Sequence, residues 1–134
     1  MDETPHFQNA FLDSLASAFR ARRRLLSEKA CLVELTKSIG ADGQEQLEIA
    51  MDGIVGRGPK LKFHAWSDRR VRIDARQPAK LGWAWSWSHD GRLTEDCGPR
   101  SFIEALEGTY ELIGEMTPSR TTTLDATWKA LVVS

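Results

Sequence analysis

The chain has 134 residues, of which 41% are hydrophobic and 28% charged, and its formal net charge is −1. This length and composition are typical of a globular protein that buries a core without metals or disulfides, so we expect residues 1–134 to form a single domain. The near-zero net charge excludes a general attraction to nucleic acid or to an anionic membrane surface. No apolar run reaches the ~18 residues that a membrane span requires.

The cysteines and the N-terminus suggest where the protein resides. Cys31 and Cys97 lie far apart and form no CxxC motif, a usage more typical of a reducing compartment than of a disulfide framework. Asp2 and Glu3 make the N-terminus acidic, and the unbroken apolar segment of a signal peptide does not follow them. We therefore expect a cytoplasmic protein without membrane contact.

Residues 4–26 are predicted to form a helix. Thr4 suits the N-cap, and Pro5 suits the first helical position. Apolar residues then recur at three- and four-residue steps, namely Phe7, Phe11, Leu15, Ala18, Phe19, Leu25 and Leu26. This stripe indicates that one face of the helix is buried.

Residues 30–39 and 46–52 each alternate between apolar and polar side chains, and the run Gly40-Ala41-Asp42-Gly43 between them is a strong turn signal. We favour a β-hairpin here. The alternative continues the first helix to residue 39, because Leu25, Lys29, Leu32, Val33 and Thr36 also fit helical spacing.

The middle of the chain is predicted to be an antiparallel meander of about four to six strands. Residues 61–66 and 71–76 alternate around a turn at 67–69, and Pro78 should end the second strand because proline cannot donate to a ladder. The run 81–88 is predicted to be the next strand, turning at His89-Asp90-Gly91 and returning through 92–94.

The C-terminal part is predicted to be helical. Ser101 and Glu104 after Pro99 have the spacing of a capping box, and the helix should end at 116–118. For the tail, helical spacing of apolar residues favours a short helix, while its threonines and valines favour a strand. The whole order predicts an α+β fold: an N-terminal helix, an antiparallel meander, and a C-terminal helix or helices packed on one sheet face.

The tryptophans and arginines form the most distinctive pattern in the chain. Trp83, Trp85 and Trp87 alternate with small residues, so a strand would project all three rings from one face. Residues 57–80, just before them, hold eight Lys and Arg side chains against two Asp, a net charge of +6. Aromatic rings beside arginine are enriched at protein interfaces and also stack single-stranded bases.

These observations define a candidate partner-binding surface. Its predicted residues are Trp66, Arg70, Arg72, Arg76, Trp83, Trp85 and Trp87. The tryptophans and arginines could also fall on different faces, and we favour a core position beneath the helices for one or two of the rings, because indole burial removes much apolar area from water.

The sequence shows no catalytic or metal-binding signature. Ser88, His89 and Asp90 are adjacent and cannot build the relay of a hydrolase, and the histidines lack zinc spacing. Cys97 should precede a helix N-terminus, which lowers a thiol pKa, but no histidine base is evident nearby. His64, Tyr110 and Cys97 are the candidates for a pocket. We predict no catalytic residues, no cofactor and no metal.

The sequence hypothesis is therefore a non-enzymatic protein-binding module, such as a small adaptor, a secretion-chaperone-like protein, or an immunity or inhibitor protein. Its surface would meet another protein, and a second copy of the chain is one such partner. The alternative is a single-stranded nucleic-acid-binding protein that uses the basic segment 57–80 and exposed tryptophans.

Overall fold

The computed structural model describes residues 5–53, 58–80, 83–115 and 121–133, without the side chains of 78–80, 83 and 84. The elements are α1 (Ala10–Leu26), β1 (Leu32–Ile39), β2 (Glu45–Asp52), β3 (Lys60–Trp66), β4 (Arg70–Lys80), β5 (Trp83–Leu93), α2 (Pro99–Gly114), α3 (Thr121–Lys129) and β6 (Val132–Val133). The described strands form one antiparallel sheet in the order β1-β2-β3-β4-β5-β6. The predicted α+β fold is confirmed.

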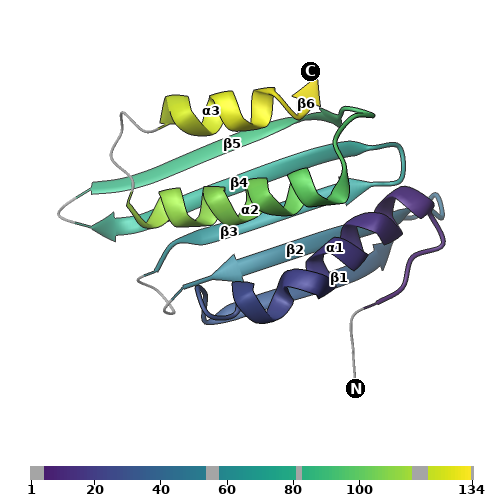
Figure 1. The fold of residues 1–134 in the computed structure, drawn as a ribbon, viewed down its shortest axis with the longest axis horizontal. Coiled ribbons are helices and arrows are strands. Elements are labelled where there is room, and N and C mark those ends of the chain that lie inside the picture. The colour runs from purple at the N-terminus through teal and green to yellow at the C-terminus, as the bar shows by residue number, and fades with distance from the viewer. Residues whose placement is uncertain (1–4, 54–57, 81–82, 116–120, 134) are drawn as a thin grey trace.

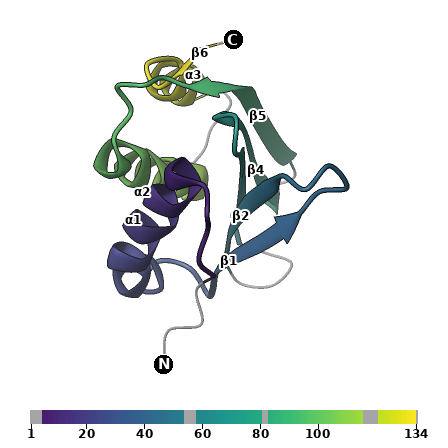
Figure 2. The ribbon, with the colours of Figure 1, turned by 90° about the vertical axis from the view of Figure 1, so that its right-hand side faces the viewer.

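The molecule has two layers. Figure 1 shows α1, α2 and α3 in front of the sheet, and the view turned by 90° in Figure 2 shows the three helices on one side of it. Because successive strand residues point to opposite faces, one set of side chains meets the helices. The other set projects from the face without helices, which we call the open face.

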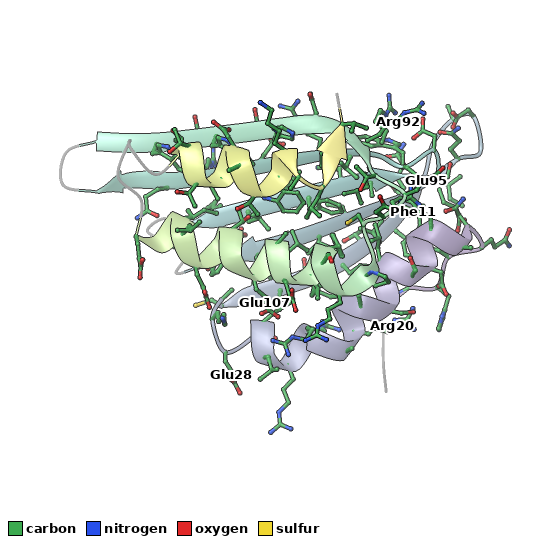
Figure 3. The ribbon with its side chains drawn as sticks, turned by 45° about the horizontal axis from the view of Figure 1, so that its top comes forward. Phe11, Arg20, Glu28, Arg92, Glu95 and Glu107 are labelled. Carbon is green, nitrogen blue, oxygen red and sulfur yellow. The ribbon has the colours of Figure 1, made fainter. Side chains whose placement is uncertain are left out.

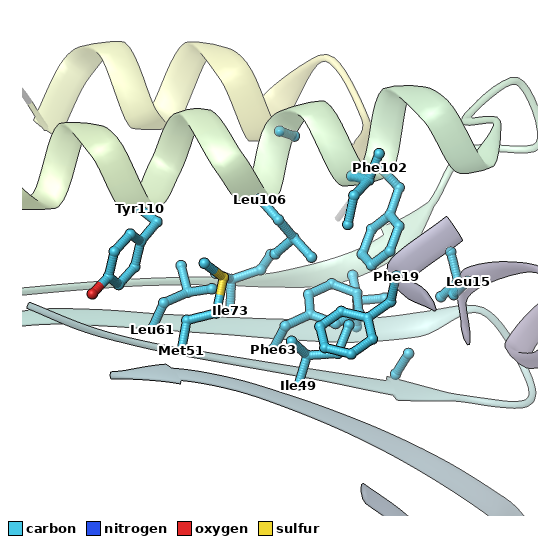
Figure 4. Packing of buried hydrophobic residues seen from close by; sticks show 14 of the residues in the cluster. Leu15, Phe19, Ile49, Met51, Leu61, Phe63, Ile73, Phe102, Leu106 and Tyr110 are labelled. Carbon is cyan, nitrogen blue, oxygen red and sulfur yellow. The ribbon is translucent and has the colours of Figure 1, made fainter. Parts of the chain in front are cut away.

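The core lies between the helices and the sheet. Figure 4 shows Phe102, Leu106 and Tyr110 of α2 above side chains from the strands, with Phe19 of α1 beside them. Phe63 of β3 and Phe102 are fully buried, with ring centroids 4.9 Å apart. Burial of these rings and their aliphatic neighbours is the main stabilising contribution to the fold.

α1 starts later than the sequence predicted. Thr4 lies outside the described residues, and Pro5 is not in the helix. The N-cap is Asn9, whose side-chain oxygen accepts a hydrogen bond from the Leu12 amide at 3.0 Å. The Glu45 carboxylate accepts the amide hydrogen of Asn9 at 2.8 Å. These two interactions hold the preceding segment in a non-helical conformation.

The predicted hairpin is confirmed, and the alternative of a continuous helix to residue 39 is wrong. α1 ends at Leu26, and β1 pairs with β2 from Leu32–Asp52 to Ile39–Glu45. In the turn, the Gly40 amide donates to the Gln44 carbonyl at 2.8 Å, and Gly43 has a positive φ of 82°. Glycine adopts this left-handed conformation without steric cost, which explains why the turn falls there.

Two predictions about β4 and β5 are wrong. β4 does not end at Pro78 but continues to Lys80, with an irregular register after Gln77 that accommodates the missing proline donor. The chain does not turn at 89–91, because these residues pair with 71–73 inside β5. Gly91 has a φ of 153°, and a Cβ atom there would lie 2.4 Å from the Val133 carbonyl oxygen of β6. Its glycine serves a close backbone approach rather than a turn.

The C-terminal helices also differ in detail from the prediction. α2 begins at Pro99, with Gly98 as its N-cap and no side-chain cap, so Ser101 lies inside the first turn and the predicted capping box is wrong. α2 ends at Gly114, and the predicted end at 116–118 lies outside the described residues. Both tendencies of the tail are realised, since the short helix α3 is followed by β6. None of the described helices is both long and apolar enough to cross a membrane.

Candidate functional site

The open face of β3 and β4 gathers four of the predicted partner-binding residues. Trp66 ends β3, and Arg70, Arg72 and Arg76 alternate along β4 with the buried residues that face the helices. The Arg70 guanidinium carbon lies 4.4 Å from the centroid of the Trp66 ring. On the same strand, His64 stacks against Trp66 with centroids 6.0 Å apart. The structure therefore brings Trp66 and the three arginines onto one surface.

Trp85 and Trp87 of β5 lie on the opposite face. Trp85 is only 9% exposed, and it pairs in register with the buried Gln77 on the helix side. Trp87 is half-buried, and its indole nitrogen donates to the Asp125 carboxylate of α3 at 2.7 Å. The side chain of Trp83 lies outside the described residues. A single surface that joins Trp85 and Trp87 to the arginines is thus not found, because the strand registers direct the two sets to different faces.

The helix side of β5 carries its own polar row. His89 stacks on Trp87 with centroids 6.0 Å apart. The buried Gln77 Oε1, Trp85 Nε1 and His89 Nε2 have no hydrogen-bond partner among the described residues. This row is separated by the sheet from the arginines, so one partner on the open face cannot contact both sets.

The open face of β3, β4 and β5 is predominantly basic. Its charged side chains in the described part of these strands are Lys60, Lys62, Arg70, Arg72, Arg76 and Arg92, against Asp74 and Asp90. The neighbouring strands β1 and β2 contribute Glu34, Glu48 and Asp52 to the same face. The open face therefore has an acidic side and a basic side, with Lys62 and Glu48 meeting between them at 3.6 Å.

Two like-charge pairs stand directly opposite each other across strands. Lys60 of β3 pairs in register with Arg76 of β4, and Arg70 of β4 pairs with Arg92 of β5. Figure 3 shows Arg92 on the side of the ribbon away from α2. Like charges in direct cross-strand register destabilise a sheet. In the described part of the chain, no ion pair joins Lys60, Arg76 or Arg92 to an acid.

Each like-charge pair borders a shallow hollow. One hollow, of about 580 Å³, has a lining that includes the cations Lys60, Lys62 and Arg76, the acids Asp52 and Asp74, and the serines Ser86 and Ser88. Another hollow, of about 480 Å³, lies where β3 ends and β4 begins. It is lined by Trp66 at the end of β3, by Arg70, Val71 and Arg72 at the start of β4, and by Asp90, Gly91 and Arg92 of β5. The cationic and hydroxyl groups that line such hollows can donate hydrogen bonds to carboxylate or phosphate groups.

Sequence reasoning missed Arg92, Ser86 and Ser88. The assignment of 89–91 as a turn placed Arg92 on a separate strand, whereas it lies opposite Arg70 at the end of β5. The local signal for it is weak, because the apolar–polar alternation of 85–88 is interrupted by His89, Asp90 and Gly91 before it resumes at Arg92 and Leu93. The alternation with the tryptophans predicts that Ser86 and Ser88 lie on the opposite, exposed face, but it does not single them out as site residues.

The three candidates for a pocket are not brought together. His64 lies on the open face, while Tyr110 and Cys97 are buried on the helix side. Burial raises the pKa of the Cys97 thiol, opposed by the charge of Arg69, so the net direction is opposite to the lowering that a helix N-terminus would give. Burial also raises the pKa of Tyr110, with further contributions from Cys31 and Asp52. Within the described ranges, no three His, Cys, Asp or Glu side chains gather as metal ligands.

Comparisons of the chain with protein-family models, with curated proteins and with solved structures found no match.

Proposed function

We propose that the chain is a non-enzymatic protein-binding module whose open face holds an acidic surface of another protein. The observation that carries this proposal is the two like-charge cross-strand pairs, Lys60–Arg76 and Arg70–Arg92, whose four side chains form no ion pair in the described part of the chain. A sheet that keeps such contacts on a face without helices gains stability when an anionic partner binds, because the partner relieves the repulsion.

Trp66 and Arg70 are the proposed anchors of this interface. Their cation–π contact holds the planar guanidinium over the face of the indole before any partner arrives. Preorganised tryptophan and arginine side chains lose little conformational entropy on binding, and both residue types are enriched among interface hot spots. The salt bridges of Arg72 with Asp74 and Asp90, at 3.1 and 3.2 Å, hold the centre of the face in a fixed arrangement.

Nucleic-acid binding has less support. Modules that bind single strands stack successive bases on exposed rings. Of the tryptophans whose side chains are described, Trp66 alone lies on the open face, since Trp85, Trp87 and Trp128 are on the helix side. Cations without a row of stacking rings favour a protein partner over single-stranded bases.

The test is co-purification from the native cell with a charge-reversed open face. Arg70→Glu with Arg76→Glu should lose a partner that wild type retains. The matched control is Arg24→Glu with Lys129→Glu, which makes the same change in net charge at exposed helix positions. The partner should remain bound to this control, and its purified complex with wild type should be measured by calorimetry.

Three outcomes would contradict the proposal. One is a partner that both double variants lose equally, which would indicate a general effect of charge. Another is a partner that survives the open-face reversal. The third is a labelled single-stranded oligonucleotide that binds wild type, quenches tryptophan fluorescence and loses affinity only in the open-face variant, which would favour nucleic acid.

A further inference from the structure

The positive charge of the open face is concentrated at two ends. The Lys60–Arg76 pair lies toward one end of β4, and the Arg70–Arg92 pair lies at the other. Between them, Arg72 is engaged by two acids, Asp74 and Asp90. The face therefore has a basic end, a neutralised middle and a second basic end.

At the first end, the cations outnumber the acids that remain near them. Asp52 and Asp74 also line the hollow of Lys60 and Arg76. Asp74 is held by Arg72 at 3.1 Å, and Asp52 stands opposite Lys60 in the register without forming an ion pair with it. Ser86 stands opposite Arg76 in the register, so its hydroxyl can donate to an anion that Arg76 binds. This end offers two cations and a hydroxyl to one oxyanion.

At the second end, an anion would meet two arginines beside an aromatic ring. Arg70 and Arg92 face each other across β4 and β5, and the Trp66 ring forms one wall of the hollow. The contact with Trp66 orients the Arg70 guanidinium, and its N–H groups stay available as hydrogen-bond donors to an anion. Asp90 at this end is held by Arg72 at 3.2 Å.

The strand fixes the separation of the two ends. Residues 70 and 76 are six positions apart on the same face of one strand. At about 3.3 Å per residue, this corresponds to about 20 Å. An acidic residue in the middle of a bound segment would be repelled by Asp74 and Asp90. The segment that fits therefore has an acidic residue at each end and neutral residues between them.

We propose that the open face recognises an extended segment of a partner protein that carries two acidic groups about 20 Å apart with neutral residues between them. This inference rests on the proposed protein-binding function and specifies the partner's chemistry. Each end binds one carboxylate or phosphate, supplied by Asp, Glu or a phosphorylated side chain. Two tethered contacts bind more tightly than either alone only when their spacing matches the two ends.

Polyproline peptides provide a ruler for this spacing, because a polyproline II helix rises about 3.1 Å per residue. Peptides with Asp-Asp at both ends and three, six or twelve prolines between them place the nearest acids about 12, 22 and 40 Å apart. Fluorescence anisotropy with the whole chain at low salt should give the six-proline peptide at least tenfold higher affinity than the other two. Phosphoserine ends should give the same optimum, and Asn-Asn ends should not bind.

Single variants connect the optimum to the two ends. Arg76→Gln and Arg70→Gln should each reduce the affinity of the six-proline peptide to that of the others, while Arg24→Gln should leave it unchanged. Both test variants remove one member of a like-charge contact, so they should fold, which circular dichroism checks. Equal affinity at all spacings would overturn the inference.

The outcomes also separate this inference from the proposed function. If spacing has no effect but charge reversal of the open face still abolishes the partner complex, the protein-binding function stands and the two-ended recognition is wrong. If a single-stranded oligonucleotide, charged at every phosphate, binds wild type as tightly as the six-proline peptide, the acidic-neutral-acidic pattern is wrong. Loss of both the spacing optimum and the dependence of the complex on charge reversal contradicts both proposals.

Discussion

At the scale of single residues, one buried hydrogen bond joins two helices. The Trp128 indole nitrogen of α3 donates to the Thr109 hydroxyl of α2 at 2.7 Å, and both side chains are buried. Trp128 also stacks near Phe63 of β3, with centroids 6.3 Å apart. The hydrogen bond therefore fixes a large ring at the point where α2, α3 and the sheet meet.

Thr109→Val should destabilise the protein by about 1–3 kcal/mol, because it leaves the buried indole N–H without an acceptor. The change preserves side-chain shape, so packing contributes little to the loss. Urea denaturation measures the difference in free energy of unfolding. Thr123→Val, at an exposed position of α3, is the matched control and should stay within about 0.5 kcal/mol of wild type. Equal effects of the two variants would show that the hydrogen bond does not contribute.

Two glycines should respond in opposite ways to substitution by alanine. Gly91→Ala places a methyl group 2.4 Å from a backbone oxygen of β6 and should cost about 1–3 kcal/mol. Gly108→Ala, inside α2 with no atom within 4 Å of the added carbon, should stabilise by about 0.5–1 kcal/mol. Thermal unfolding measures both. A stabilised Gly91→Ala would mean that β6 does not hold this position.

Residue types alone identified part of the candidate site. Trp66, Arg70, Arg72 and Arg76 were found because alternation fixes which neighbours share a face. Alternation cannot fix which face of the sheet the helices cover, and for that reason the placement of Trp85 and Trp87 remained open. Arg92 was missed because a glycine that accommodates β6 resembles a glycine that makes a turn.

At the scale of elements, side-chain contacts position α1 relative to the sheet and to α2. The Glu45 carboxylate of β2 accepts the amide hydrogens of Gln8 and Asn9 at the start of the helix. At the other end of α1, Arg22 donates two hydrogen bonds to Glu107 of α2. Figure 3 shows Glu107 between the two helices. These hydrogen bonds raise the pKa of Arg22.

Glu45→Gln should destabilise the protein at neutral pH, and the difference should shrink in acid. The backbone amides of Gln8 and Asn9 lower the pKa of Glu45, so the ionised form stabilises the fold. This stability is fully present above the ordinary glutamate pKa of about 4.3 and is lost as pH falls through the lowered value. Thermal unfolding of both proteins between pH 2 and 7 tests this.

The control for Glu45 is Glu28→Gln, at an exposed position just after α1. It should change stability by less than about 0.5 kcal/mol across the same pH range. A Glu45→Gln difference that stays constant down to pH 2 would contradict the role given to the ionised carboxylate.

Elements were predicted better than their ends. The hairpin of β1 and β2 and the helix α2 follow from hydrophobic period and turn signals, which are local. The start of α1 depends on Glu45, and the continuation of β4 beyond Gln77 depends on pairing with β5. Such interactions join residues that are distant in the sequence, so local patterns cannot specify them.

At the scale of the whole molecule, the fold class followed from element order, since terminal helices around consecutive strands leave few arrangements other than helices on one face of a meander. Function did not follow in the same way, because a fold of this kind does not determine chemistry. The charge pairs of the open face became visible only through the register, which places Lys60 opposite Arg76 and Arg70 opposite Arg92.

The registers from β1 to β5 join odd-numbered residues to odd and even to even, apart from the irregular stretch after Gln77. In these strands, the odd positions face the helices and supply the sheet's share of the core, apart from the exposed Ile39 at the end of β1, and the even positions build the outer surface. A descendant of this protein could therefore exchange its even positions for new recognition chemistry while inheriting the odd ones intact. Binding specificity and folding would then depend on separate sets of alternating positions in the same strands.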